Sequence, residues 1–182
     1  MKKFIWIHCV TATLLTLASA PLFAHLALEE KSALTGSSYK AVLRVSHGCE
    51  GSATTGITVR IPSGFKGAKP MPKAGWTLST KLTKLATPYT SHGKQITEEV
   101  TEISWVANTR EAWLPDAYFD EFILRGTLPD TPGALWFKML QTCETGSNDW
   151  AEIPASGIST KGLKRPAVLL EVLRPAARTH AH

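Results

Sequence analysis

The sequence predicts an all-β protein, an antiparallel β-sandwich that is Ig-like with a cupredoxin-like outline. Three observations carry this prediction: short segments in which apolar and polar residues alternate, turn residues between those segments, and only one short segment with a helical pattern. A chain of 182 residues provides one such domain rather than two. Seven or more short strands separated by turns are typical of two packed antiparallel sheets.

The first expected strand is Tyr39–Val45, where every second residue is apolar, so that one face is buried. A second, over 57–61, ends at Pro62. Further strands are expected at Trp76–Leu78, Val100–Val106, Phe122–Leu128, Leu135–Leu140 and Trp150–Ile153. The segment 129–133, Pro-Asp-Thr-Pro-Gly, is the densest turn signal among them. The apolar segment 166–173 begins with proline and fits either a terminal helix or an added strand.

Residues 1–24 have the pattern of a secretory signal peptide. A positively charged start precedes an apolar stretch over 4–17, and small residues follow at 18–20 and at Ala24. Cleavage after residue 20 would leave Pro21 at the cut, which signal peptidases disfavour, so we expect cleavage after Ala24 and a mature chain that begins at His25. An uncleaved anchor is the alternative, but a membrane span needs about 20 apolar residues. The protein is therefore expected to be periplasmic or extracellular.

The positive charge of the chain is concentrated at its two ends. The net charge is +5, and removal of the two lysines of the signal peptide leaves +3. Residues 157–182 hold five basic residues and one acidic residue, a net of +4, so residues 25–156 carry −1. This distribution argues against a nucleic-acid-binding surface. We expect residues 157–182 to form a basic C-terminal tail that is partly disordered.

Two of the three cysteines remain after the signal peptide is removed, namely Cys49 and Cys143. An even pair in an oxidising compartment favours a disulfide, which fits a link between the sheets or between strand ends. The chain-entropy model values a loop of this length at roughly 4–5 kcal/mol. A cysteine-based metal site or a redox pair is the alternative, and the absence of a C-x-x-C motif weighs against it.

A histidine at a free N-terminus is a bidentate metal ligand. The α-amine and the imidazole Nδ1 of His25 would close one chelate ring on a single ion. Their reference pKa values of about 8 and about 6.5 make the loss of the competing protons inexpensive at neutral pH. Two nitrogens suit tetragonal Cu(II), and a carboxylate or a second imidazole would complete the site. An ordinary exposed terminal residue is the alternative.

Two further clusters of polar residues accompany the cysteines. The first, His47-Gly-Cys-Glu-Gly-Ser52, follows the first strand. Glu50 fits either a ligand or a solvated loop carboxylate, and His47 fits a ligand or, as we favour, a turn residue. The second cluster, Gln141-Thr-Cys-Glu144, precedes Trp150, which follows a polar turn where a core residue is less expected. An aromatic face at that position would shield a bound cation.

Several of these motifs occur together in one known family. The segments are His47–Ser52, Lys69–Trp76, His92–Lys94, Phe119–Phe122, Leu128–Gly133, Gln141–Glu144 and Trp150–Pro154. In this order, and over about residues 25–155, they resemble the YcnI-like family of bacterial copper-binding domains. The resemblance implies an Ig-like sandwich that binds Cu(II) through a single N-terminal histidine brace, with an acidic residue and a tryptophan contributing.

The resemblance implies His25 as the brace, Glu50 as the carboxylate and Trp150 as the tryptophan, with Trp136 as a weaker candidate. Two features depart from the family. Members often begin with His-Val, whereas this chain has His25-Leu26. Some members carry a C-terminal membrane helix, for which the apolar segment here is too short. The copper-binding sandwich is thus expected to span residues 25–156.

The expected function is a periplasmic copper-binding protein, a copper chaperone or storage module in copper homeostasis. Its expected partners are the copper ion and other periplasmic copper-handling proteins, without nucleic acid and without a stable membrane span. A copper-dependent oxidative enzyme is one alternative, because histidine braces also occur in copper oxygenases. The remaining histidines, His47, His92, His180 and His182, show no brace-partner spacing, which favours binding over catalysis. A metal-free structural or adhesive sandwich is the third alternative.

Overall fold

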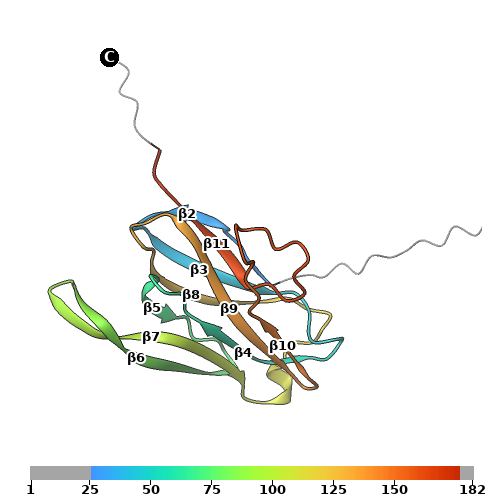
Figure 1. Cartoon of the computed structure of the whole chain (residues 1–182). Coiled ribbons are helices and arrows are strands. Elements are labelled where there is room, and N and C mark those ends of the chain that lie inside the picture. Colours follow the sequence, from blue (N-terminus) through green and yellow to red (C-terminus); the bar gives the residue numbers. More distant parts are fainter. Residues whose placement is uncertain (1–25, 177–182) are drawn as a thin grey trace, which may run out of the picture.

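Figure 1 shows the computed structural model of the protein, in which residues 26–176 are described. Two β-sheets pack face to face, which confirms the predicted all-β sandwich. The one helical element among the described residues is a single 3₁₀ turn, Arg110–Ala112. Within this part of the chain, no helix has the length and apolar character needed to cross a membrane.

The smaller sheet has four strands in the order β1-β3-β8-β5, and every neighbouring pair is antiparallel. Its strands are β1 (Ala27–Leu28), β3 (Ser38–Val45), β8 (Asp120–Thr127) and β5 (Lys66–Pro70). β3 pairs with β8 over its whole length, and its buried residues alternate with exposed Ser38, Lys40 and Arg44. The apolar residues of the alternating pattern therefore face the core, as the sequence predicts.

The larger sheet has the order β2-β11-β9-β4-β7-β6. Its strands are β2 (Ser32–Leu34), β11 (Val168–Leu173), β9 (Gly133–Cys143), β4 (Thr54–Arg60), β7 (Lys94–Ala107) and β6 (Trp76–Ser91), and β10 (Ser147–Trp150) pairs with β9. β2 and β11 are parallel, and the other pairs are antiparallel. β11 pairs with the first half of β9 and β10 with the second, so these two strands follow one another along β9.

The segment after residue 166 is a strand, so the strand alternative is confirmed over the helix. Val168, Leu170 and Val172 alternate into the core, a period-two pattern that a helix would not bury on one side. A core strand therefore lies inside the segment that the sequence assigned to a C-terminal tail, and the sandwich continues past residue 156 to Leu173. His180 lies outside the described residues, as do His182 and the predicted signal peptide.

The structure also differs from the predicted strand limits at two places. β10 covers residues 147–150 rather than 150–153, because the polar residues there pair with β9. β6 and β7 form a hairpin much longer than the apolar pattern suggested, turning at His92-Gly93. The outer part of this ribbon is mostly exposed on both faces, so its sequence lacks apolar alternation.

The core between the sheets is rich in aromatic side chains. Trp105, Phe122 and Phe137 are fully buried, and the ring of Phe122 meets Trp105 and Trp76 edge-on at 5.7 and 5.1 Å. Such edge-to-face pairs add about 0.5–1.5 kcal/mol beyond the area that they bury. Trp76 and Trp105 are thus core residues, and their role in packing leaves them outside the search for a functional site.

Candidate metal centre

A disulfide joins the two sheets at one end of the sandwich. Cys49 lies in the loop after β3 of the smaller sheet, and Cys143 ends β9 of the larger sheet. Their Cα atoms are 6.0 Å apart, which confirms the predicted bridge and its position at strand ends. Both polar clusters singled out in the sequence are therefore covalently connected.

Glu50 occupies a strained position in a two-residue turn. The backbone N–H of Cys49 donates to the carbonyl of Ser52 at 3.0 Å, and that of Ser52 donates to Cys49 at 2.9 Å. Both central residues have positive φ, +51° at Glu50 and +86° at Gly51, as in a type I′ turn. Asn, Asp and Gly are the residues that tolerate this conformation, so a glutamate is unexpected at the first position. Its side chain is exposed.

Gly48 allows the loop to close upon itself. A Cβ at this position would lie 1.7 Å from the carbonyl oxygen of Ser52, so no other residue fits without moving the backbone. The N–H of Gly48 donates to Oδ1 of Asp116 at 2.8 Å, which fixes the loop against the segment before β8. Asp116 had no sequence signal, because it lies in an irregular segment 68 residues further along the chain.

Gln141 is the centre of the hydrogen-bond network behind this loop. Its side chain is fully buried on β9. Its Nε2 donates to the carbonyl of His47 at 2.7 Å and to Oγ1 of Thr54 at 2.8 Å. Its Oε1 accepts from Nε1 of Trp150 at 3.2 Å and from Nδ2 of Asn148 at 3.4 Å. All four hydrogen-bonding positions of the amide are thus used.

Trp150 is held by this network and meets His47. The indole is 3% exposed, and its ring centroid lies 6.3 Å from that of His47 in an edge-on arrangement with an interplanar angle of 69°. His47 is half-buried, so it is more than a solvated turn residue. Trp136 lies on the opposite face of β9 from Gln141, because side chains alternate along the strand. The indole that joins the polar clusters is therefore that of Trp150.

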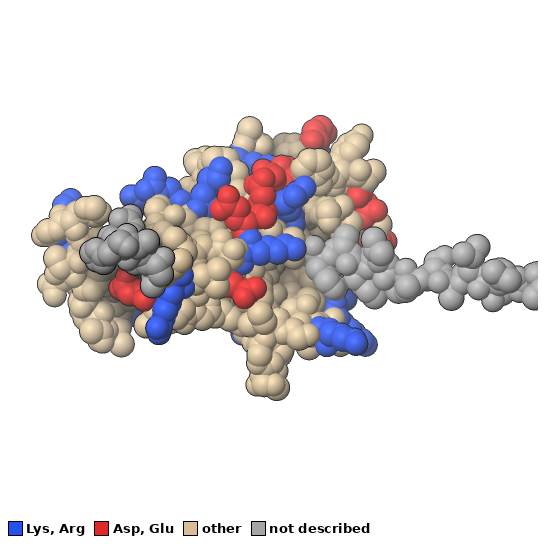
Figure 2. Space-filling view, turned by 90° about the horizontal axis from the view of Figure 1, so that it is seen from above, with Lys and Arg blue, Asp and Glu red and all other residues tan. Residues whose placement is uncertain are grey.

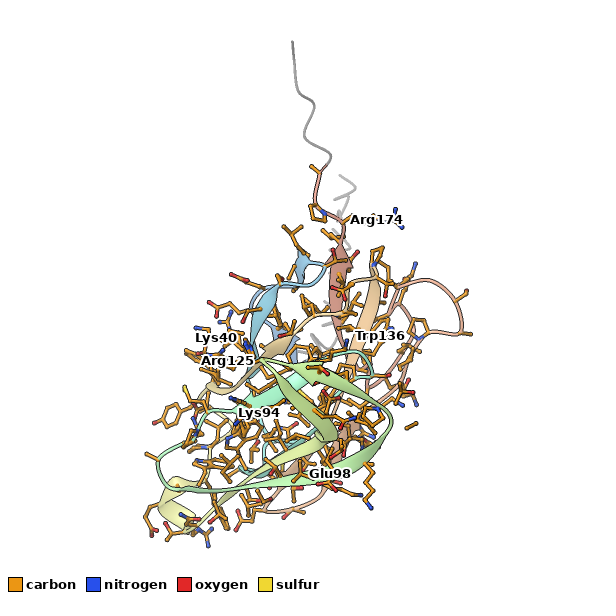
Figure 3. The ribbon with its side chains drawn as sticks, turned by 90° about the vertical axis from the view of Figure 1, so that its left-hand side faces the viewer. Lys40, Lys94, Glu98, Arg125, Trp136 and Arg174 are labelled. Atoms are coloured by element: carbon orange, nitrogen blue, oxygen red, sulfur yellow. A yellow bond between two sulfur atoms is a disulfide. The ribbon has the colours of Figure 1, made fainter. Side chains whose placement is uncertain are left out.

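Figure 3 shows the position of Trp136 relative to the two sheets. Its label lies on one side of the molecule, and Lys40 and Arg125, which are paired across β3 and β8, lie on the other. Each group belongs to the outer face of a different sheet. Neither outer face contains the buried network around Gln141.

A groove of about 220 Å³ connects Glu50 with the network. Glu50 lines it together with Asn148, which donates to Gln141, and Arg165 from the loop before β11. The groove is also lined by the disulfide residue Cys49. Glu50 is thus connected to Trp150 only indirectly: Glu50 and Asn148 line one groove, and Asn148 and Trp150 both donate to Oε1 of Gln141.

His25, the main predicted ligand, lies outside the described residues. The described chain starts at buried Leu26 and enters β1, whose Ala27 pairs with Arg44 of β3. Because β1 and β3 are antiparallel, Leu26 lies toward the end of β3 that continues into His47. Within residues 26–176, no group of three or more His, Cys, Asp or Glu side chains is placed to hold a metal ion.

The described donors suit Cu(II) in type without completing a site. Glu50 supplies a carboxylate and His47 an imidazole, both of which Cu(II) accepts. A copper site at this end consequently needs donors from outside the described range. His92, by contrast, is in the turn between β6 and β7, at the other end of the molecule from the loop between β3 and β4 (Figure 1).

The charges of the surface show no large area of one sign on the face that Figure 2 presents, where acidic and basic side chains are intermixed. Two ion pairs occur among the described residues, Lys73 with Asp120 at 2.6 Å and Arg110 with Glu144 at 2.9 Å. The second pair lies beside the disulfide, because Glu144 directly follows Cys143. Neither ion pair involves Glu50.

The comparisons with known proteins bear first on the fold. The crystal structure of an uncharacterized protein from Nocardia farcinica, which has an immunoglobulin-like fold, is similar with a TM-score of 0.62. The two sequences are 22% identical, and the match covers 81% of this chain and 97% of that chain. This similarity confirms the predicted Ig-like fold.

A second structure, the seventh ScaB type I cohesin from Pseudobacteroides cellulosolvens, matches with a TM-score of 0.41 and 8% identity over 87% of this chain and 97% of that one. Among curated proteins, none matches the sequence. A family model described as a domain of unknown function, DUF1775, matches residues 25–172, a range that reaches into β11. The chain therefore belongs to the DUF1775 family, which also includes YcnI.

Proposed function

We propose that this protein is a periplasmic copper-binding protein that carries Cu(II) as its cargo, with His25 as an N-terminal brace, Glu50 as an oxygen ligand and Trp150 beside the ion. Export with a signal peptide would release the His25 amine and would place the protein in the oxidising compartment that its disulfide suits. Binding and delivery, rather than catalysis, is the role proposed.

The conformation of Glu50 is the observation that carries this proposal. A glutamate at φ +51° costs conformational energy that asparagine or glycine would avoid. Residues held in sparsely populated conformations cluster at functional sites. An exposed carboxylate fixed beside a disulfide is a suitable oxygen donor for a divalent ion.

The network around Gln141 gives the proposal its second support. It holds the Trp150 indole and the His47 backbone in fixed positions at the end where β1 enters the sandwich. Rigid surroundings are what a ligand set requires, because donors that are already ordered bind without a further loss of side-chain entropy. Trp150 would contribute shielding rather than a strong bond, since its indole N–H is a donor only.

The first experiment tests the amine of His25. The exported protein with a free His25 is compared with a variant that carries one extra alanine before it, both titrated with Cu(II) and followed by electron paramagnetic resonance. The extension converts the amine to an amide, which lacks the basic lone pair, so we expect the tight site to be lost while the fold is retained. Equal affinities and identical spectra would refute the brace.

The second experiment tests Glu50 with one substitution at two matched turns. Glu50→Asn and His92→Asn each place asparagine at a positive-φ position, which asparagine tolerates well. We expect both variants to be at least as stable as the parent in urea. Only Glu50→Asn should weaken Cu(II) binding, because it removes a charged oxygen. Unchanged affinity in both variants would exclude Glu50 as a ligand.

A third measurement separates binding from catalysis. The copper-loaded protein is incubated with ascorbate and peroxide on chitin or cellulose, and soluble oligosaccharides are quantified. We expect no release above that of free copper. Turnover that depends on His25 would favour the oxidative enzyme over the proposed binding protein.

A further inference from the structure

We infer that the outer face of the smaller sheet is a docking surface for an acidic segment of a partner protein, one that presents carboxylates on both sides of an apolar side chain. The surface consists of three cations and an apolar groove beside them. The three cations, which we call the cation row, are Lys40, Arg125 and Lys69. None of them belongs to the candidate metal centre, so this inference is independent of the proposed copper site.

The cation row crosses three neighbouring strands at one level. The strand pairing places Lys40 of β3 opposite Arg125 of β8, and Arg125 opposite Lys69 of β5. All three residues are exposed on the outer face, since the residue that precedes each of them is buried. Figure 3 shows Lys40 and Arg125 close together on this sheet. Like charges directly opposite one another destabilise a sheet, so two such contacts in one row are a cost that packing does not explain.

Other cations beside this face have partners within the molecule. Arg44 lies over the ring of Phe119, 5.9 Å from its centroid, and Lys73 forms an ion pair with Asp120 at 2.6 Å. By contrast, no residue of the cation row forms an ion pair within residues 26–176. Carboxylates from another molecule would supply the charge-assisted hydrogen bonds that these three side chains can donate.

An apolar groove of about 260 Å³ lies beside the cation row. Apart from the cations, its lining includes Pro70, Met71, Pro72 and Ile123. The N–H of Met71 donates to the carbonyl of Ile123 at 2.8 Å, and Nε1 of Trp105 donates to the carbonyl of Met71 at 3.0 Å. The Met71 side chain is 52% exposed, and methionine adapts its shape to an apolar partner. Because its backbone is already fixed, the groove can accept an apolar side chain at little cost in ordering.

The size and lining of the groove favour a protein segment over other partners. Pockets for small ligands are usually about 300–1,000 Å³, so this groove suits one side chain of a larger molecule better. A second copy would bring one cation row against the other in a symmetric contact, which their like charges oppose. A membrane takes up apolar groups that project from a protein, whereas these line a hollow. Single-stranded nucleic acid stacks on aromatic side chains, and no aromatic side chain lines the groove.

The probe is a short acidic peptide. Because residues i, i+2 and i+4 of an extended chain share one face, the capped peptide Glu-Ser-Leu-Ser-Glu presents two carboxylates around one leucine. It is titrated into the exported, copper-free, ¹⁵N-labelled protein, and amide chemical shifts are followed by nuclear magnetic resonance. We expect shifts around Arg125 and Ile123 at about 1 mM peptide. Peptides with glutamine in place of each glutamate, or serine in place of leucine, should bind more weakly.

The cation row is tested with the triple variant Lys40→Gln/Lys69→Gln/Arg125→Gln. Its control has the same change of net charge at exposed lysines elsewhere, Lys81→Gln/Lys84→Gln/Lys161→Gln. The first variant should lose about tenfold in peptide affinity, whereas the control should bind as the parent does. The urea midpoint of the first variant should stay equal or rise, because the repulsion within the row is removed. Met71→Gln should also weaken peptide binding, although it changes no charge.

Each result decides for or against the inference. No shifts in the parent, or equal affinities in the parent and the first triple variant, would overturn it. Binding to vesicles of phosphatidylglycerol that requires the cation row, without a response to the peptide, would assign the surface to a membrane instead. A dimer that requires the cation row would assign it to a second copy. If the triple variant does not fold, the affinities of the glutamate and glutamine peptides for the parent decide, and equal values would overturn the inference.

Discussion

Removal of the disulfide between Cys49 and Cys143 should have a large effect on stability. The two residues are 94 positions apart, and the chain-entropy model assigns a loop of that length about 4.7 kcal/mol at 25 °C. The double variant Cys49→Ser/Cys143→Ser should lose this amount. Urea unfolding of a domain of this size has a slope of about 2 kcal/mol/M, so the midpoint should fall by a little more than about 2 M.

The control is the parent protein in reductant, which should unfold at the same urea concentration as the double variant, while the variant itself should not respond to reductant. The turn at Glu50 keeps its two backbone hydrogen bonds without the bridge, so Cu(II) affinity should change less than stability. A loss of less than about 1 kcal/mol would refute the reasoning, because it would mean that the reduced chain already brings these residues together when unfolded.

Three further predictions concern the described structure. Gln141→Leu should lower the free energy of unfolding in urea by about 3–5 kcal/mol, because it leaves several buried groups without a hydrogen-bond partner, at about 1–3 kcal/mol each. A decrease below about 1 kcal/mol would contradict the role of this network. Gly48→Ala should cost at least about 2 kcal/mol, since its Cβ meets backbone, and a neutral result would show that the loop can open. Burial, reinforced by Glu99 at Tyr89, raises the pKa values of Tyr39 and Tyr89 to about 12. Because the folded state holds these protons more tightly, the contribution of these two tyrosines to stability should be constant below pH 10 and be lost between pH 10 and pH 12. A tyrosinate absorbance rising fully by about pH 10.5 would contradict this.

The strands that the sequence could predict are those with one face in the core. β3 and β8 carry alternating residues that the sandwich buries, and the alternation is readable without a structure. The sequence of β11 fits either a helix or a strand, because a short apolar segment satisfies both patterns until its partners are known. The outer half of the β6–β7 hairpin has no such pattern, because neither of its faces is covered.

Only part of the candidate site could be predicted from the sequence, because the residues that hold it in place are brought together by tertiary contacts. Glu50 and Trp150 stood out by their positions near cysteines and turns, and the disulfide accounts for bringing those segments together. Gln141 is a polar residue of the kind usually found at the surface, and nothing in its local sequence indicates that it is fully buried. Asp116 lies in an irregular segment whose contact with Gly48 depends on the packing of two loops.

Gln141 also explains why a polar network can be retained in the core of this small sandwich. An amide with four satisfied partners costs little to bury, whereas a partly satisfied one would cost about 1–3 kcal/mol for each unpaired group. Because every hydrogen-bonding position of Gln141 is used, the site is restricted to one arrangement: moving the loop of His47 or the indole of Trp150 breaks a buried hydrogen bond. The fold thus fixes the loop of His47 and the indole of Trp150, whereas the Glu50 side chain is exposed to solvent. This division predicts that the Cu(II)-bound and copper-free proteins differ little around Gln141, and an amide exchange experiment showing faster exchange there without copper would contradict it.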